Sequence, residues 1–170
     1  MTTPQAPSAS SPPPLYFAYG SNMDASRMLG REVPFRVREA ARLDGFQLLF
    51  NKVASRRPRE GYANIVPCTG ETVEGILYHL AGKSGLDALD RFEGAPDHYR
   101  RIEVEVLTSR GSRVRAAAYQ AGREWQRPGL RPSREYMDHL LAGSDLLSPR
   151  YVARLRAMPP LWRLTSQPDE

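Results

Sequence analysis

Cysteine is almost absent from the sequence, and its scarcity excludes several kinds of chemistry. Cys68 is the single cysteine among 170 residues. One thiol can form no disulfide within the chain and cannot supply the several thiolates of a structural zinc site. A reducing, cytoplasmic setting is therefore expected, because stable disulfides are typical of oxidising compartments.

Long hydrophobic runs are absent as well. No apolar stretch approaches the roughly 20 residues that a membrane-spanning helix requires. The first residues lack the basic segment and the apolar segment of a secretory signal peptide. The sequence therefore predicts neither a membrane partner nor a signal peptide.

Lysine is scarce in a chain that is nevertheless basic. Only Lys52 and Lys83 are lysines among the 24 basic side chains, and the formal net charge is +5. The arginines are scattered, apart from one tight cluster at residues 56–59, and no aromatic-rich strand accompanies them for stacking on bases. We therefore expect no nucleic-acid partner, although charge alone keeps that interpretation open. A positive field favours small anionic substrates.

Proline, serine and threonine gather at the N-terminal end. Residues 1–14 have no apolar periodicity and are expected to form a disordered tail, and residues 165–170 are expected to fray. Residues 15–164 have a length that suits one domain. The composition does not distinguish a monomer from a homodimer.

Strand patterns dominate the region between the two ends. Asp44-Gly45 and Thr69-Gly70 are typical of hairpin turns, and residues 55–60 are expected to form an irregular basic loop. The expected strands cover residues 15–19, 35–43, 45–54, 62–67, 73–80, 99–108 and 113–121.

Short helices are expected between and after these strands. A helical turn is expected at residues 24–30, with Asp24 or Asn22 as its cap. Three further helices are predicted: one with Ser84 as its N-cap and Gly94 just past its end, one that begins at Ser133, and one that begins at Ser148 with Pro149 at its first position. This order predicts an α+β fold, a mixed and mostly antiparallel β-sheet or barrel with short peripheral helices.

Glu93 is the first candidate for chemistry. At about 100° per residue, it lies between Leu86 and Leu89 on the apolar stripe of its predicted helix. Burial and the negative end of the helix dipole would both raise the pKa of this carboxyl towards the range of a general base. An ordinary exposed last-turn glutamate remains the alternative.

The segment Gly20-Ser21-Asn22 is the second candidate. Backbone N–H groups that leave a strand and enter a helical turn can form an anion-binding concavity, and glycine permits close approach. A plain capped turn is the alternative. Ser21 is a weak candidate for a nucleophile, because no G-x-S-x-G motif surrounds it. His98 is a rival base, although a surface position in a loop is the simpler interpretation.

The chain contains the motifs "YFAYGSNM", "VEGILYHL", "LDALDRFEG" followed by "YRRIEVEV", "RPSREYMDHLLAG" and "LSPRYVARL". Together these motifs strongly resemble the γ-glutamylcyclotransferase family, including a form that removes a γ-glutamyl protecting group in biosynthetic pathways. Their order matches across roughly residues 15–158. The resemblance implies a compact barrel or sheet, and an enzyme that needs no metal or cofactor and acts on a small γ-glutamyl substrate.

The resemblance also implies roles for individual residues. The family's catalytic acid falls on Glu93. Its substrate-binding positions fall on Tyr16, Phe17, Ala18, Tyr19, Gly20, Ser21, Asn22, Tyr99, Tyr119 and Tyr136. The segments 55–60 and 123–132 are this chain's own, which leaves the choice of substrate open. A non-catalytic relative that binds a small carboxylate is the remaining alternative.

Overall fold

Two long antiparallel strands form the largest part of the sheet. In the computed structural model, which describes residues 11–161, β2 (Phe35–Ala54) and β3 (Arg57–Leu80) form one hairpin. Ala54 pairs with Arg57, so the turn is at residues 55 and 56. The prediction of separate strands joined by turns at 44–45 and 69–70 is therefore wrong, as is the irregular loop at 55–60.

Glycines at the two predicted turns bend this hairpin without ending its strands. Gly45 and Gly70 have φ angles of +80° and +86°, which favour glycine. Asp44 pairs with Thr72 while Phe46 pairs with Pro67, so residues 68–71 bulge opposite Gly45. An extra stretch of backbone on one strand bends both strands while pairing continues on either side.

The sheet closes into a barrel with the strand order β1-β3-β2-β4-β5. The other three strands are β1 (Leu15–Ala18), β4 (Tyr99–Thr108) and β5 (Arg113–Ala121). The pairings are antiparallel except for the contact of Tyr16 in β1 with Ala117 in β5, which is parallel and closes the ring. The predicted mixed, mostly antiparallel barrel is confirmed.

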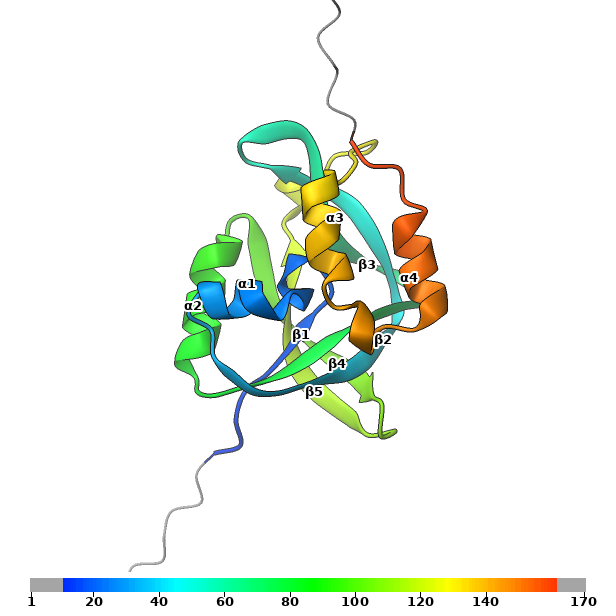
Figure 1. The fold of residues 1–170 in the computed structure, drawn as a ribbon. Coiled ribbons are helices and arrows are strands. Elements are labelled where there is room, and N and C mark those ends of the chain that lie inside the picture. The colour runs from blue at the N-terminus through cyan, green and yellow to red at the C-terminus, as the bar shows by residue number, and fades with distance from the viewer. Residues whose placement is uncertain (1–10, 162–170) are drawn as a thin grey trace, which may run out of the picture.

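Short helices lie around the outside of the barrel (Figure 1). The α-helices are α1 (Ala25–Gly30), α2 (Ser84–Glu93), α3 (Arg134–Leu141) and α4 (Pro149–Arg156). The 3-10 turns are η1 (Ser21–Met23), η2 (Arg123–Trp125) and η3 (Ser144–Leu146). No helix among residues 11–161 combines the length and the apolar character needed to cross a bilayer.

Three of the α-helices have an N-cap residue whose side chain accepts a backbone hydrogen bond. Asp24, Ser133 and Ser148 each accept a hydrogen bond from a backbone N–H in the first turn, as predicted. The predicted cap at Ser84 is wrong. Ser84 is already the first helical residue of α2, and Lys83 takes the cap position without a side-chain hydrogen bond.

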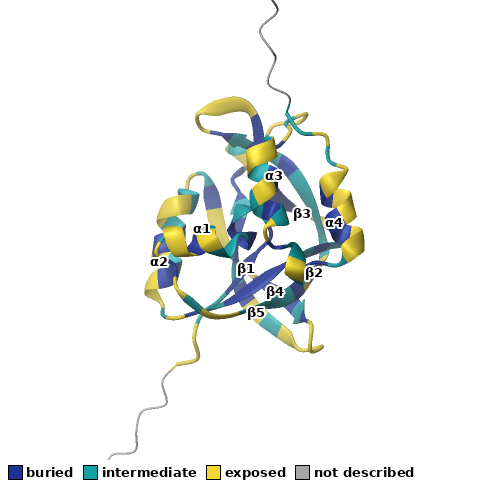
Figure 2. Cartoon of the chain, in the orientation of Figure 1, coloured by how far each residue is buried: buried dark blue, intermediate teal, exposed yellow. Residues whose placement is uncertain are grey.

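The core fills the barrel and supports β1 closely. The central strands are buried, whereas the outer turns of the helices are exposed (Figure 2). Phe17, Ile76 and Tyr78 are fully buried. A Cβ on Gly75 would lie 2.4 Å from the Ala18 carbonyl oxygen. The missing side chain therefore leaves room for the end of β1, which pairs with β3.

Parts of the predicted tails lie outside the described residues. Residues 1–10 of the expected tail and all of the expected frayed end, 165–170, are among these. Residues 11–14 have no regular secondary structure, although the Pro14 carbonyl accepts a hydrogen bond from the Leu80 amide.

Candidate active site

The chain leaving β1 forms one wall of a small inner cavity. Tyr19 and Gly20 follow the strand directly, and η1 begins at Ser21. A Cβ on Gly20 would lie 3.1 Å from the Ala63 Cβ and 3.2 Å from the Tyr136 hydroxyl oxygen. The missing side chain permits this close approach, while the φ of −115° lies outside the left-handed region that favours glycine.

Glu93 ends α2 on the opposite wall. Gly94 terminates the helix in the left-handed conformation, with φ of +61°. Leu89, one turn earlier, is fully buried, and the Glu93 side chain is only 17% exposed. The carboxylate lies where the inner cavity meets a larger outer one, since it lines both. The neighbouring Phe92 is 52% exposed and lies under the Arg31 guanidinium, 5.0 Å from the ring centre.

Asn22 connects the loop to Glu93. Its Nδ2 donates to the Glu93 Oε1 at 3.1 Å and to the Tyr16 hydroxyl at 3.0 Å. Its Oδ1 accepts from the Arg31 Nη1 at 2.8 Å. The guanidinium of Arg31 can only donate, so it fixes Oδ1 towards Arg31 and Nδ2 towards Glu93 and Tyr16. Arg31 Nη1 also lies 3.8 Å from the Glu93 Oε1.

Burial raises the pKa of Glu93 above its ordinary value of 4.5. Removing a carboxylate from water penalises its charged form. The cations Arg31, Arg27 and Lys52 oppose this shift, as does the hydrogen bond from Asn22, and the net direction remains upward. A carboxylate in this state holds a proton more readily than an exposed one and can also give it up near neutral pH.

Tyrosines line the inner cavity, whose volume is about 30 Å³. Their hydroxyls are mostly tied to fixed partners. Tyr99 donates to the Ala63 carbonyl at 2.9 Å, and the Tyr136 hydroxyl accepts from the Ala63 amide at 3.0 Å. Tyr119 donates to Asp90 Oδ1 at 2.6 Å, and Tyr19 donates to the Tyr119 carbonyl. These bonds hold the rings in place and so preform the cavity.

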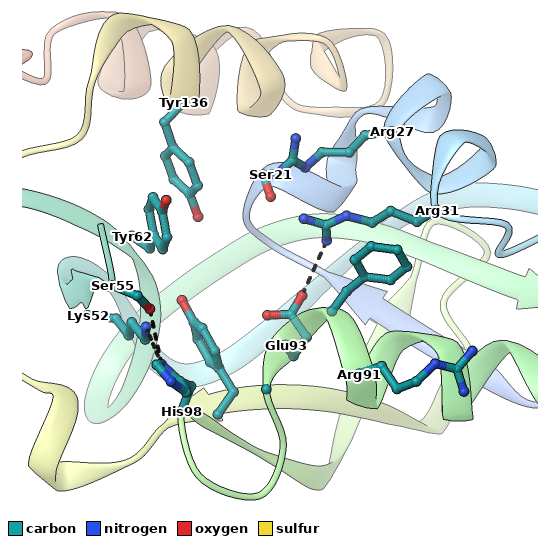
Figure 3. Close-up of a pocket in the computed structure, with 13 residues that line it drawn as sticks. Ser21, Arg27, Arg31, Lys52, Ser55, Tyr62, Arg91, Glu93, His98 and Tyr136 are labelled. Carbon is teal, nitrogen blue, oxygen red and sulfur yellow. Dashed lines mark hydrogen bonds and ion pairs between the residues drawn. The ribbon is translucent and has the colours of Figure 1, made fainter. Parts of the chain in front are cut away.

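The outer cavity has a volume of about 330 Å³ and is predominantly cationic. Its lining includes Glu93 as the single carboxylate among the described residues, together with the cations Arg27, Arg31, Lys52 and Arg91. In Figure 3, Arg31 and Glu93 lie on one side of this space, and Lys52, Ser55 and His98 lie on the other. Such a site suits a small ligand with more than one negative charge.

The structure brings most of the predicted site residues together. The inner cavity is lined by Tyr16, Tyr19, Gly20, Ser21, Asn22, Glu93, Tyr99, Tyr119 and Tyr136, with Ala63. Phe17 and Ala18 are fully buried in the core and line neither of these two cavities.

Part of the outer wall consists of residues that the sequence did not predict as site residues. Arg31, Lys52 and Tyr62 were not singled out, although all three line the outer cavity. His98 also lies in this wall, with its ring stacked 3.8 Å from that of Trp125. A usable signal existed for Lys52, because it is a rare lysine within an apolar strand.

The barrel and the buried glutamate at the end of α2 define a small-molecule enzyme site, and comparisons with known proteins identify the family. The family model described as gamma-glutamyl cyclotransferase, AIG2-like, matches residues 16–138. The chain belongs to this family.

Individual relatives agree with this assignment. The chain is 31% identical to the human gamma-glutamylcyclotransferase over 152 residues, which cover 86% of this chain and 79% of the human one. It is 34% identical to the bovine gamma-glutamylcyclotransferase over 110 residues, 62% of this chain and 58% of that protein. A solved structure named gamma-glutamyl cyclotransferase superposes with a TM-score of 0.76 at 29% identity, covering 92% of this chain and 94% of its own.

Proposed function

We propose that this γ-glutamyl cyclotransferase acts on γ-glutamyl amino acids or amines and that Glu93 is its proton-transferring residue. One observation carries the proposal. The Glu93 carboxylate is the single acid in a cavity that is otherwise cationic and tyrosine-lined within residues 11–161, and it is held there by Asn22. Its raised pKa suits general acid–base catalysis.

The reaction is an intramolecular cyclisation. The α-amine of the γ-glutamyl group attacks the γ-carbonyl carbon of the same group, which forms a C–N bond and closes a five-membered ring. The original amide C–N bond then breaks, and 5-oxoproline and a free amine leave. Because the nucleophile belongs to the substrate, the protein mainly has to fold the γ-glutamyl group into the attack geometry.

Glu93 moves one proton through this sequence. The attacking amine must lose a proton as the new C–N bond forms, and the ionised carboxylate accepts it. The leaving nitrogen needs a proton to depart as an amine, and the protonated carboxyl returns it. No net proton is consumed by the protein, so one residue serves first as base and then as acid.

The loop at residues 20–22 binds the negative charge of the substrate in this proposal. The first backbone hydrogen bond of η1 runs from the Met23 amide to the Gly20 carbonyl. The amides of Ser21 and Asn22 precede Met23 in the chain, so they take no part in that backbone hydrogen bond. They can donate either to the oxyanion that develops on the γ-carbonyl or to the α-carboxylate of the substrate.

The test is to detect 5-oxoproline by mass spectrometry after incubation with a panel of γ-glutamyl amino acids and amines. Wild-type protein is expected to release it, and Glu93→Gln is expected to lose about 10²–10⁴-fold in kcat. Asp87→Asn makes the same chemical change at an exposed position of the same helix and should keep full activity. An active Glu93→Gln variant, or no product from any substrate, would refute the proposal.

We also propose a cytoplasmic location and a monomeric or homodimeric state. The single thiol fits a reducing compartment. Fractionation of cells that express the protein tests the location, and light scattering during gel filtration measures the mass in solution. A mass above that of a dimer would contradict the second part.

A further inference from the structure

Lys52 is a buried cation in the wall of the outer cavity, and the proposed mechanism does not use it. The residue is only 2% exposed. Its Nζ donates to the Val53 carbonyl at 2.9 Å and lies 3.0 Å from the His98 Nδ1. It also lies 4.9 Å from the ring centre of Trp125. Two tyrosines, Tyr62 and Tyr99, complete an aromatic surround, at 5.8 and 5.5 Å.

Each direct partner of this ammonium group is uncharged. Burial and the nearby Lys52 lower the pKa of His98, which favours a neutral ring whose Nδ1 accepts a hydrogen bond from Nζ. No carboxylate within residues 11–161 lies within 4 Å of Nζ, since Lys52 forms none of the ion pairs found there. The charge of Glu93 acts on Lys52 only from beyond this distance. A buried charge without a counter-charge in direct contact is costly, and an anionic ligand in the cavity would supply one.

The ammonium group has one donor to spare. It carries three N–H groups, and the described residues provide hydrogen-bond acceptors for two of them, the Val53 carbonyl and the His98 ring. Lys52 lines the same cavity as Glu93, and Figure 3 shows the two side chains on different sides of it. The third N–H is therefore available to a ligand in that cavity.

Lys52 lies in the part of the site where the leaving group of the substrate would be placed. If the γ-carbonyl of the substrate lies beside Glu93, where the inner cavity meets the larger outer one, the leaving group attached to the scissile nitrogen extends into the outer cavity. In a γ-glutamyl amino acid, the carboxylate of the leaving amino acid is attached one carbon away from that nitrogen. In a γ-glutamyl amine, this position carries no charge.

We propose that Lys52 is the specificity-determining residue that binds the carboxylate of the leaving amino acid, so that the enzyme prefers γ-glutamyl amino acids to γ-glutamyl amines. This inference rests on the proposed function and assigns its substrate class. His98 and Trp125 position the ammonium group. Both approach it from elements other than β2, since His98 precedes β4 and Trp125 belongs to η2.

The first test compares two substrates on the wild-type protein and needs no variant. γ-Glutamyl-alanine and γ-glutamylethylamine differ only by the carboxylate on the leaving group. We expect kcat/KM to be higher for γ-glutamyl-alanine by about 10–100-fold, the range of one hydrogen bond to a charged group. Equal values would overturn the inference while leaving the cyclotransferase activity in place.

The second test uses Lys52→Met, which keeps an unbranched apolar chain in the aromatic surround but removes the charge. The ratio of kcat/KM for the two substrates is expected to fall by about tenfold or more, and Lys52→Arg is expected to restore part of it. Lys83→Met changes the only other lysine, which is exposed, and should leave the ratio unchanged. A ratio that survives in a folded Lys52→Met protein would overturn the inference.

A third measurement separates this inference from the proposed chemistry. Calorimetric titration of the Glu93→Gln variant with the same two compounds reports binding without turnover. Tighter binding of γ-glutamyl-alanine, lost when Lys52→Met is added, supports the role of Lys52 even if no 5-oxoproline is ever detected. Equal affinity for both compounds counts against it, whatever the activity of the wild type.

Discussion

The side-chain amide of Asn22 donates a hydrogen bond of 3.1 Å to the carboxylate of Glu93, across 71 positions of sequence. The contact joins the turn after β1 to the end of α2, so the barrel and a peripheral helix together build the proposed proton-transfer site. It also lowers the pKa of Glu93, against the larger upward effect of burial. The balance of these effects leads to two predictions on pH dependence.

The first prediction is an acidic limit of activity set by Glu93. The ionised carboxylate of Glu93 accepts the proton. This form is lost as the pH falls through the raised pKa of Glu93 in the folded protein. We expect kcat/KM to decline below a midpoint that lies above 4.5, the ordinary value. Rates for γ-glutamyl-alanine between pH 4 and 8 measure it, and a midpoint at or below 4.5 would show that another group controls the reaction.

The second prediction concerns Asn22→Asp. The change replaces a donor to Glu93 by a second acid, and two neighbouring carboxylates resist ionising together. We expect the acidic limit of kcat/KM to move up by about one pH unit or more. Asn22→Ala removes the hydrogen bond without adding charge and should shift the limit less. Identical pH profiles for the wild type and Asn22→Asp would mean that the hydrogen bond does not act on catalysis.

The third prediction tests the close approach at Gly20. In Gly20→Ala the new methyl group meets the Tyr136 hydroxyl at 3.2 Å and the Ala63 Cβ at 3.1 Å, so it should narrow the inner cavity and lower kcat/KM. In a Tyr136→Phe background the hydroxyl is gone, and the same substitution should cost less. A double-mutant cycle compares kcat/KM for the wild type, the two single variants and the double variant. We expect an interaction energy between the two substitutions on the order of 1 kcal/mol. Strictly additive effects would contradict this geometry.

The fourth prediction concerns stability. Gly75→Ala would bring a methyl group to 2.4 Å from the Ala18 carbonyl oxygen, in backbone that cannot move aside without displacing β1. We expect a loss of about 2 kcal/mol in the free energy of unfolding, typical of overpacking. Gly82→Ala meets nothing within 4 Å and serves as the matched control, with an effect within about 0.5 kcal/mol. Urea denaturation measures both, and equal midpoints would contradict the prediction.

Local patterns in the sequence were sufficient for the fold class and for most helix starts. Asp24, Ser133 and Ser148 cap their helices because capping depends on a few adjacent residues. The turns predicted at Gly45 and Gly70 failed for a physical reason. A glycine with positive φ can end a strand or bulge it, and the outcome depends on pairing with a partner strand about 25 residues away.

Some residues of the candidate site could be predicted from local sequence patterns, and others could not. Glu93 and the loop after β1 stand out because helical periodicity and a small polar turn are local features. The environment of Lys52 could not be predicted from local patterns, since Tyr62, Tyr99 and Trp125 reach it from three other elements. Only the closed barrel brings those rings together.

The long bent hairpin has a consequence for how such an enzyme diversifies. Lys52 and Tyr62 lie near its turn, in the part of the outer cavity proposed to hold the leaving group, whereas Asn22 and Glu93 come from separate segments. Substitutions near the hairpin turn can therefore change which amine is released without touching the groups that close the ring. In this arrangement, the choice of leaving group and the ring-closing chemistry are encoded in different stretches of the chain.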